Sequence, residues 1–380
     1  MSIVAQDPAT QVAEEDQIAI DEKQVDERAY DLAGVSANKR VSESSNLAYK
    51  RNLNAQSLSS SKTSIADSIL NFRIENGRTY HAYKDGKYSY PNDEREKSRL
   101  DLQHNQFLLS LNGKLGLAPP NEENSEVKRV LDVGTGTGIW AIEFGELHPE
   151  AEVLGIDLSH PRTECNLLIE LVAVEEKGFL TSCRVPPNVT FEIDDIEEPW
   201  LYKEPFDYIH SRMMTSSISD WRQFIQRSYD NLTPGGYLEV QDMDLMPQSD
   251  DGTLKPDAAI VRCFAVLGEA ATVLNRSFQD IPALVDVMTE VGFVDVQIKK
   301  IKWPTNTWPK DKYYKTLGWW AHENCMSGIE GWTMAPLTRG LGWKREEVQA
   351  FLIELRKEFR DTSIHAYWPA YAIYGKKPEA

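Results

Sequence analysis

Three glycines at alternate positions, Gly134, Gly136 and Gly138, constrain this chain more than any other feature of its sequence. They follow the mostly apolar segment 130–133 and precede a helix-like segment at 140–147. Glycine has no Cβ atom, so its backbone can turn tightly and can approach a ligand closely. We therefore predict a buried strand, a tight turn and a helix N-terminus, with a ligand against the glycines. The motif alone is weak evidence, because an ordinary strand-to-helix turn can carry the same residues.

Two acidic residues indicate which ligand this is. A second strand, predicted at 152–156, ends in Asp157, nineteen residues after Gly138, where a carboxylate would receive the two hydroxyls of a ribose. The spacing G-x-G-x-G differs from the G-x-G-x-x-G of a dinucleotide site. With Asp132 inside the motif, it favours S-adenosylmethionine (SAM) over NAD. The cofactor contacts predicted here are Asp132, Gly134, Thr135, Gly136, Gly138, Asp157 and Leu158.

The rest of the core alternates predicted strands and helices. Further strands are expected at 189–193, 206–210 and 232–240, with a helix at 220–231 before the last of them. The first of these ends in Asp194 and Asp195, placed to meet an adenine amino group, and the second ends in His210. Such alternation predicts a parallel sheet with right-handed crossovers. The succession resembles the class I SAM-dependent methyltransferases. This resemblance implies an α/β fold, a Rossmann-like seven-stranded sheet with flanking helices and a helical lid.

Several short segments resemble the fungal LaeA-like methyltransferases in particular. They are 76–83 (NGRTYHAY), 90–93 (YPND), 99–104 (RLDLQH), 134–141 (GTGTGIWA), 195–200 (DIEEPW), 210–213 (HSRM) and 250–253 (DDGT). The similarity covers roughly residues 70 to 377. It implies either a small-molecule methyltransferase of fungal secondary metabolism or a nuclear regulator that binds velvet-domain partners.

Composition and pattern divide the chain into three parts. Residues 1–65 are predicted to be a disordered acidic and serine-rich tail, residues 66–125 an N-terminal helical segment that covers the cofactor site, and residues 126–380 the methyltransferase domain. Within the last part we expect an insertion at about 243–280 and an aromatic-rich lid at about 303–345. Because the tail cannot bury enough apolar surface to offset its ordering, we expect a chain starting near Ser64 to melt at the same temperature as the full chain.

Charge and cysteine content exclude several classes of partner. The net charge is −18 and the pI is about 4.9, which argues against direct binding to nucleic acid and against an anionic membrane surface. No apolar run reaches the ~20 residues that span a bilayer. The four cysteines show no metal-ligand spacing, so we expect reduced thiols, no metal site, and a cytoplasmic or nuclear protein.

Aromatic residues are concentrated in the last third of the chain. Seven of the ten tryptophans follow residue 300. Packing of the core and lid accounts for them, and so does an aromatic-walled pocket for a flat or apolar acceptor.

Ligands of doubly wound sheets bind beyond the carboxyl ends of the strands, so a catalytic base is expected there. His210 ends a strand, and histidine titrates near neutrality, which makes it a candidate base as well as a cofactor contact. A neutral histidine that only shapes the pocket fits equally well. The family resemblance implies that the N-terminal block folds over the cofactor, so Tyr80, beside His81, is a second catalytic candidate. Arg78 and Arg99 are either surface ion pairs or contacts to the methionine carboxylate of SAM.

We therefore expect an enzyme that transfers a methyl group from SAM to an unidentified acceptor, a small molecule of fungal secondary metabolism. The alternative is a LaeA-like regulator that acts in a nuclear complex with velvet-domain proteins. A third hypothesis is a SAM-binding fold that has lost turnover.

Overall fold

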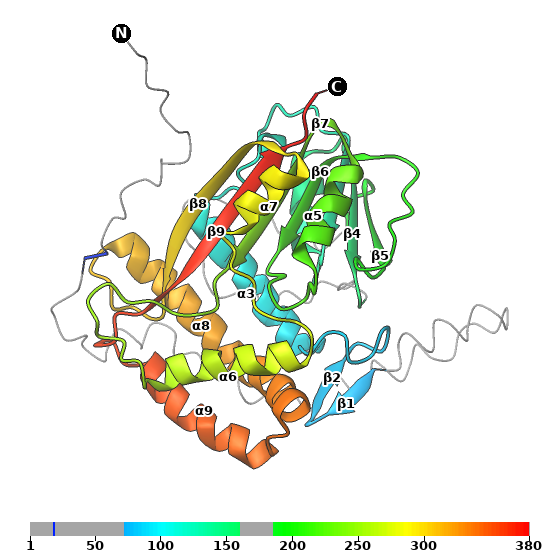
Figure 1. The fold of residues 1–380 in the computed structure, drawn as a ribbon. Helices are drawn as coiled ribbons and strands as arrows, with labels where there is room; N and C mark the ends of the chain where they lie inside the picture. The colour runs from blue at the N-terminus through cyan, green and yellow to red at the C-terminus, as the bar shows by residue number, and fades with distance from the viewer. Residues whose placement is uncertain (1–17, 20–71, 160–184, 380) are drawn as a thin grey trace, which may run out of the picture.

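A seven-stranded sheet forms the centre of the computed structural model, which describes residues 18–19, 72–159 and 185–379. Its strands are β3 (Arg129–Val133), β4 (Glu152–Asp157), β5 (Val189–Ile193), β6 (Phe206–Arg212), β7 (Leu232–Met243), β8 (Val294–Pro304) and β9 (Tyr367–Lys376). The order across the sheet is β5-β4-β3-β6-β7-β9-β8 (Figure 1). Strands β3 to β7 are parallel, and β9 runs antiparallel between β7 and β8. The predicted seven-stranded α/β fold is confirmed.

Helices cover both faces of this sheet. On one face lie α5 (Trp221–Asp230) and α7 (Leu284–Val291), and on the other lie α4 (Ile139–Leu147) and α3 (Glu94–Ser110) (Figure 1). Helix α5 packs on the sheet through one apolar face, since Trp221, Phe224 and Ile225 are buried at helical spacing. Asp220 caps the N-terminus of this helix by accepting from the Gln223 N–H. Strand β3 is buried on both faces, as expected for a central parallel strand.

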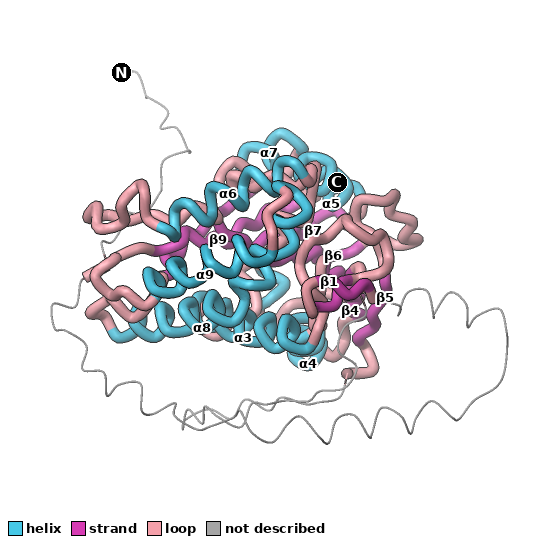
Figure 2. The backbone as a smooth tube through the Cα atoms, turned by 90° about the horizontal axis from the view of Figure 1, so that it is seen from below, coloured by secondary structure: helices cyan, strands magenta, loops and turns pink. Residues whose placement is uncertain are grey.

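A helical cap lies beyond the carboxyl ends of the parallel strands. It consists of α6 (Ala259–Val273), α8 (Lys312–Ala335), the π-turn η4 (Pro336–Gly340) and α9 (Arg345–Phe359), seen together in Figure 2. These elements share an apolar cluster with α3 and the ends of β8 and β9. Helix α6 lies within the predicted insertion, and α8 with η4 fills most of the predicted lid, whereas Trp303 lies on β8. Cys263 and Cys325 in this cluster are free and buried, and burial raises the pKa of both thiols.

The N-terminal block begins with a hairpin rather than a helix. Strands β1 (Arg73–Glu75) and β2 (Arg78–Tyr80) are joined by Asn76 and Gly77, which both have positive φ, as a tight hairpin turn requires. Helix α3 follows, within the predicted helical segment 66–125, and the short helix η3 (Pro119–Asn121) precedes the sheet. Asp93 caps α3 and forms a salt bridge with Arg78, so the hairpin and the helix are tied together.

Nearly all of the predicted tail lies outside the described residues, but Ile18 and Ala19 are placed against the folded body. Ile18 is buried, and the Ala19 carbonyl accepts a hydrogen bond of 2.8 Å from the Lys310 N–H. Removing residues 1–63 deletes both contacts. A chain starting at Ser64 should therefore melt roughly 2–6 °C lower than the full chain, in place of the unchanged temperature expected from composition. Ile18→Ser in the full chain is the matched variant for thermal melting, and an unchanged melting temperature in both would show that the contact adds no stability.

The described helices offer no membrane span, since each is too short or too polar for one. No cluster of potential metal ligands occurs among the described residues.

Candidate active site

A cavity lies between the carboxyl edge of the sheet, the N-terminal block and the helical cap. Its cofactor-side lining includes Asp132, Gly134, Thr135, Gly136, Asp157, Leu158, Asp194, Asp195 and His210. Its far side is lined by Gln106, Met243, Phe264, Leu267, Trp303, Asn324, Cys325, Trp332 and Trp368. Nine of the predicted site residues thus share one cavity, whereas Gly138 and Tyr80 do not line it.

The glycine loop turns back at the end of β3. The N–H groups of Gly134 and Thr135 donate to the Ile156 carbonyl at 2.9 and 3.0 Å, which fixes the loop against β4. Gly136 has a φ of +61°, and a Cβ atom added there would lie 3.4 Å from Leu100 of α3. Gly138, with a φ of +83°, caps α4 instead of facing the cavity. Gly136 therefore keeps the loop free of a side chain on the side that faces α3, whereas a Cβ atom added at Gly134 would lie 2.4 Å from the sulfur of Met214, which already fills that space.

Asp132 and His210 form a buried pair at the centre of this edge. They are directly opposite each other in the β3–β6 register, and His210 Nδ1 lies 2.8 Å from Asp132 Oδ1. The His210 ring stacks on Trp140 with centroids 3.8 Å apart. Asp132 Oδ2 accepts from the Thr135 hydroxyl at 2.6 Å. A carboxylate at Nδ1 favours the tautomer with the proton on that nitrogen, so Nε2 carries the lone pair. Nε2 is buried and has no partner among the described residues, which leaves it available as a base.

The acidic residues after β4 and β5 already have protein partners. Asp157 accepts from the Gly136 N–H at 3.0 Å and from the Ser159 N–H at 3.0 Å, and burial raises the pKa of its carboxyl group. Each carboxylate oxygen can accept more than one hydrogen bond, so Asp157 can still receive ribose hydroxyls. Asp195 is ion-paired with Lys87 of the N-terminal block, which closes over this end of the cavity.

Arg212 is a site residue that the sequence did not single out. Its hydrogen-bonded partner among the described residues is His104 Nδ1, at 3.0 Å, and none of those residues forms a salt bridge with it. His104 Nε2 lies 2.9 Å from Glu143. Burial lowers the pKa of Arg212 to about 10 and also lowers the pKa of His104. A charged guanidinium therefore donates a hydrogen bond to a neutral imidazole. Arg212 also lies 5.0 Å from the centroid of the Phe107 ring. The cavity therefore contains a cation that forms no salt bridge with a described carboxylate, although the charges of Asp132 and Glu143 favour its protonated form.

The N-terminal candidates have structural surroundings. Tyr80 is buried beneath Arg339, which lies 4.5 Å from its ring, and burial raises the pKa of Tyr80 to about 12. This placement, away from the cavity lining, argues against a catalytic role. His81 does line the cavity, but both its ring nitrogens contact backbone atoms of Tyr83 and Tyr88. Arg78 pairs with Asp93, and Arg99 pairs with Glu96 at 2.8 Å. Both arginines are therefore in buried ion pairs, and Arg99 also lines the cavity.

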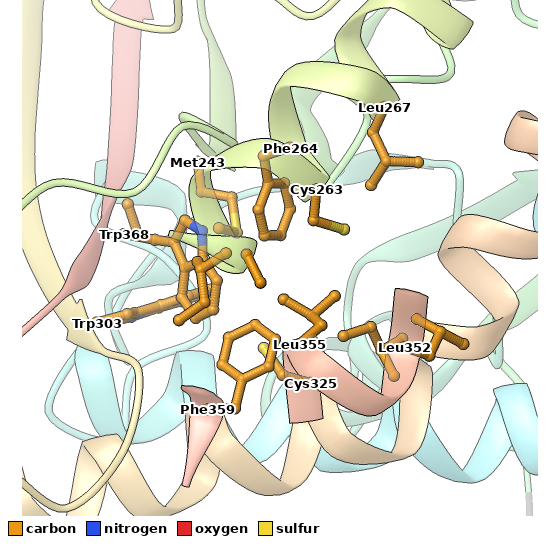
Figure 3. Close-up of a cluster of buried hydrophobic side chains, with 14 of the residues drawn as sticks. Met243, Cys263, Phe264, Leu267, Trp303, Cys325, Leu352, Leu355, Phe359 and Trp368 are labelled. Carbon is orange, nitrogen blue, oxygen red and sulfur yellow. The ribbon is translucent and has the colours of Figure 1, made fainter. Parts of the chain in front are cut away.

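Aromatic side chains form the walls of the far side. Figure 3 shows Trp303 and Trp368 in one cluster with Phe264 and Met243, contributed by β8, β9, α6 and the end of β7. The rings of Phe264 and Trp368 meet edge to face, with centroids 5.6 Å apart. Of the seven late tryptophans, Trp303, Trp332 and Trp368 line the cavity. Trp308, Trp319, Trp320 and Trp343 do not, so both explanations of the late tryptophans apply, each to part of the set.

Comparison with known proteins gives consistent matches. A family model described as a methyltransferase domain matches residues 103–298. Methyltransferase pytC of Aspergillus terreus is 36% identical over 320 residues, which cover 84% of this chain and 92% of pytC. Secondary metabolism regulator LAE1 of Cochliobolus heterostrophus is 35% identical over 310 residues, covering 80% and 95%. Secondary metabolism regulator laeA of Aspergillus fumigatus is 29% identical over 313 residues, covering 80% and 77%.

Proposed function

The chain belongs to the SAM-dependent methyltransferase family, and we propose that it methylates a hydroxyl group of a small molecule of fungal secondary metabolism. The observation that carries this proposal is the single cavity in which the glycine loop, the Asp132–His210 pair and the aromatic walls meet. The methyl-transfer part of the proposal is supported by the 36% identity with methyltransferase pytC over most of both chains.

The residues of the cavity fit SAM on three counts. Gly136 leaves the glycine loop without a side chain beside α3, and Asp157 lies where ribose hydroxyls would be accepted. Arg212 supplies a positive charge for the methionine carboxylate, and no described residue neutralises that charge by a salt bridge. When bound, SAM supplies a sulfonium methyl group that passes to a lone pair of the acceptor atom, while the electron pair of the broken S–C bond stays on sulfur.

His210 acts as the base in this proposal. Its Nε2 takes the proton of the acceptor hydroxyl as the oxygen is methylated, and the Asp132 carboxylate stabilises the imidazolium that forms. Holding both reactants in attack geometry contributes on the order of 7–11 kcal/mol, and the cap and α3 would provide this by enclosing them.

Arg212 gives a direct test of how SAM is oriented. Arg212→Met should weaken binding of S-adenosylhomocysteine by about 10- to 100-fold, because a charge-assisted interaction with its carboxylate is lost. Methylthioadenosine has the same nucleoside without the carboxylate, so its affinity should be equal in the two proteins. Calorimetry with both ligands is the measurement. An equal loss for both ligands would mean that Arg212 supports the fold of the site and does not bind the carboxylate.

A regulatory role is the second candidate, since LAE1 and laeA, which are named as regulators of secondary metabolism, match 80% of this chain. In that case the output is a nuclear complex with velvet-domain proteins. Co-purification of tagged full-length protein with velvet-domain proteins, compared between the wild type and Arg212→Met, separates the two roles. Recovery that does not depend on SAM binding favours the regulatory role, and methylated metabolites without such recovery favour the enzymatic one.

A further inference from the structure

The far side of the cavity contains two buried N–H groups without partners, and they indicate the chemistry of the acceptor. Gln106 of α3 is fully buried, and its Nε2 has no hydrogen-bond partner among the described residues. Trp368 of β9 is 2% exposed, and its Nε1 is likewise without a described partner. Both residues line the cavity. A buried donor left unpaired costs about 1–3 kcal/mol, so a ligand that satisfies it gains affinity.

The orientation of the Gln106 amide follows from a chain of hydrogen bonds between α3 and α8. Glu96 accepts from Arg99 at 2.9 Å, and Arg99 in turn donates to Asn324 Oδ1 at 2.7 Å. A guanidinium can only donate, so Asn324 must present its oxygen to Arg99 and its nitrogen to Gln106. Asn324 Nδ2 lies 3.2 Å from Gln106 Oε1. The oxygen of Gln106 is therefore occupied, and the group left for a ligand is its NH₂.

The position of Gln106 separates it from the cofactor end. Leu100, which faces Gly136, is six residues before Gln106 on the same helix, a distance of about 9 Å along the axis. Ser110, one turn further along α3 than Gln106, accepts from the Trp303 Nε1 at 2.8 Å. The Trp303 N–H is thus already paired, in contrast to that of Trp368. The free donors belong to the aromatic end of the cavity.

We infer that the acceptor is a planar aromatic compound that carries a carbonyl or other hydrogen-bond-accepting oxygen beside the hydroxyl to be methylated. This inference rests on the proposed function and narrows its substrate class. Trp303, Trp368 and Phe264 supply the flat apolar walls, and Gln106 and Trp368 supply two donors that match oxygen atoms. A protonated amine has no lone pair, so it would leave both donors unsatisfied and would place its own N–H groups against them.

Hydroxyacetonaphthone is a suitable probe, with ethylnaphthalene as its counterpart without oxygen and naphthylmethylamine as its counterpart with an amine. Binding is measured by calorimetry and by quenching of tryptophan fluorescence, on full-length protein saturated with S-adenosylhomocysteine. The hydroxyketone should bind at least about 10-fold more tightly than either counterpart, as expected for two satisfied donors. Equal binding of all three, or preference for the amine, would overturn the inference.

Gln106→Glu is the matching variant, because it keeps the shape and the bond from Asn324 but replaces the free donor with an acceptor. This variant should bind the hydroxyketone about 10-fold more weakly than the wild type does. It should bind ethylnaphthalene with the same affinity and the amine more tightly. Trp368→Phe, which keeps an aromatic wall, should lower the affinity for the hydroxyketone by about 3- to 10-fold. An unchanged affinity for S-adenosylhomocysteine in both variants shows that the cofactor site is intact. Normal cofactor binding with no discrimination among the probes would refute the inference alone, whereas failure to bind the cofactor would refute the proposed function.

Discussion

Gly136→Val should abolish measurable binding of SAM and of S-adenosylhomocysteine. Gly136 has a φ of +61°, a conformation that costs a β-branched residue about 1–2 kcal/mol, and its Cβ would already lie 3.4 Å from Leu100. The two methyl groups of valine would then extend into the space between the glycine loop and α3, where the cofactor is proposed to lie. Calorimetry with both ligands measures the effect.

The same substitution at Gly252 is a matched control for backbone strain. Gly252 has a φ of +72°, and a Cβ added there would meet nothing within 4 Å. Gly252→Val should lower the melting temperature about as much as Gly136→Val while leaving cofactor affinity unchanged. If Gly136→Val folds and binds SAM as tightly as the control, the cofactor does not lie against the glycine loop.

The sheet could be predicted because its signals are local. The apolar strands and the turn glycines each occupy a few consecutive residues, and both lie in the fold where they were predicted. Asp132 and His210 could be placed at the same edge for a related reason, since both come at or near the ends of parallel strands. Their direct hydrogen bond depends on the register of β3 against β6, and a single sequence does not give that register.

Arg212 shows why the rest could not be predicted. The segment 210–213 contributes to the family resemblance, but that Arg212 forms no salt bridge with a described residue is a property of the packed structure. His104 is far from both Glu143 and Arg212 in the sequence, yet α3 places it between Glu143 of α4 and Arg212 of β6. Tyr80 shows the reverse case. Its position before the core suggested contact with the cofactor, but the hairpin turns it under Arg339 on the cap.

Likewise, the Gln106 donor could not have been found by pattern. Gln106 lies in an ordinary amphipathic stretch of α3. Its NH₂ group is the free one because Asn324, more than two hundred residues later, donates a hydrogen bond to its oxygen. Long-range pairing of this kind fixes the polarity of an amide, and the polarity of the free group decides which ligands fit.

His210→Asn should lower kcat by about 10²- to 10⁴-fold while leaving the affinity for S-adenosylhomocysteine nearly unchanged. Asparagine keeps much of the size and can still hydrogen-bond to Asp132, but it has no basic nitrogen to take the proton of the hydroxyl. Turnover of hydroxyacetonaphthone by the two proteins, each saturated with SAM, is the measurement.

The acidity of the acceptor provides the decisive comparison for His210. A nitro-substituted hydroxyketone is already ionised at neutral pH, so the base has no proton to remove. The loss caused by His210→Asn should therefore shrink to a few-fold with this acceptor and remain large with the parent compound. A loss of the same size with both acceptors would mean that the imidazole acts through its stacking on Trp140 and its bond to Asp132, as a wall that orients the reactants. In that case proximity alone would account for the transfer, and Nε2 would not be the base.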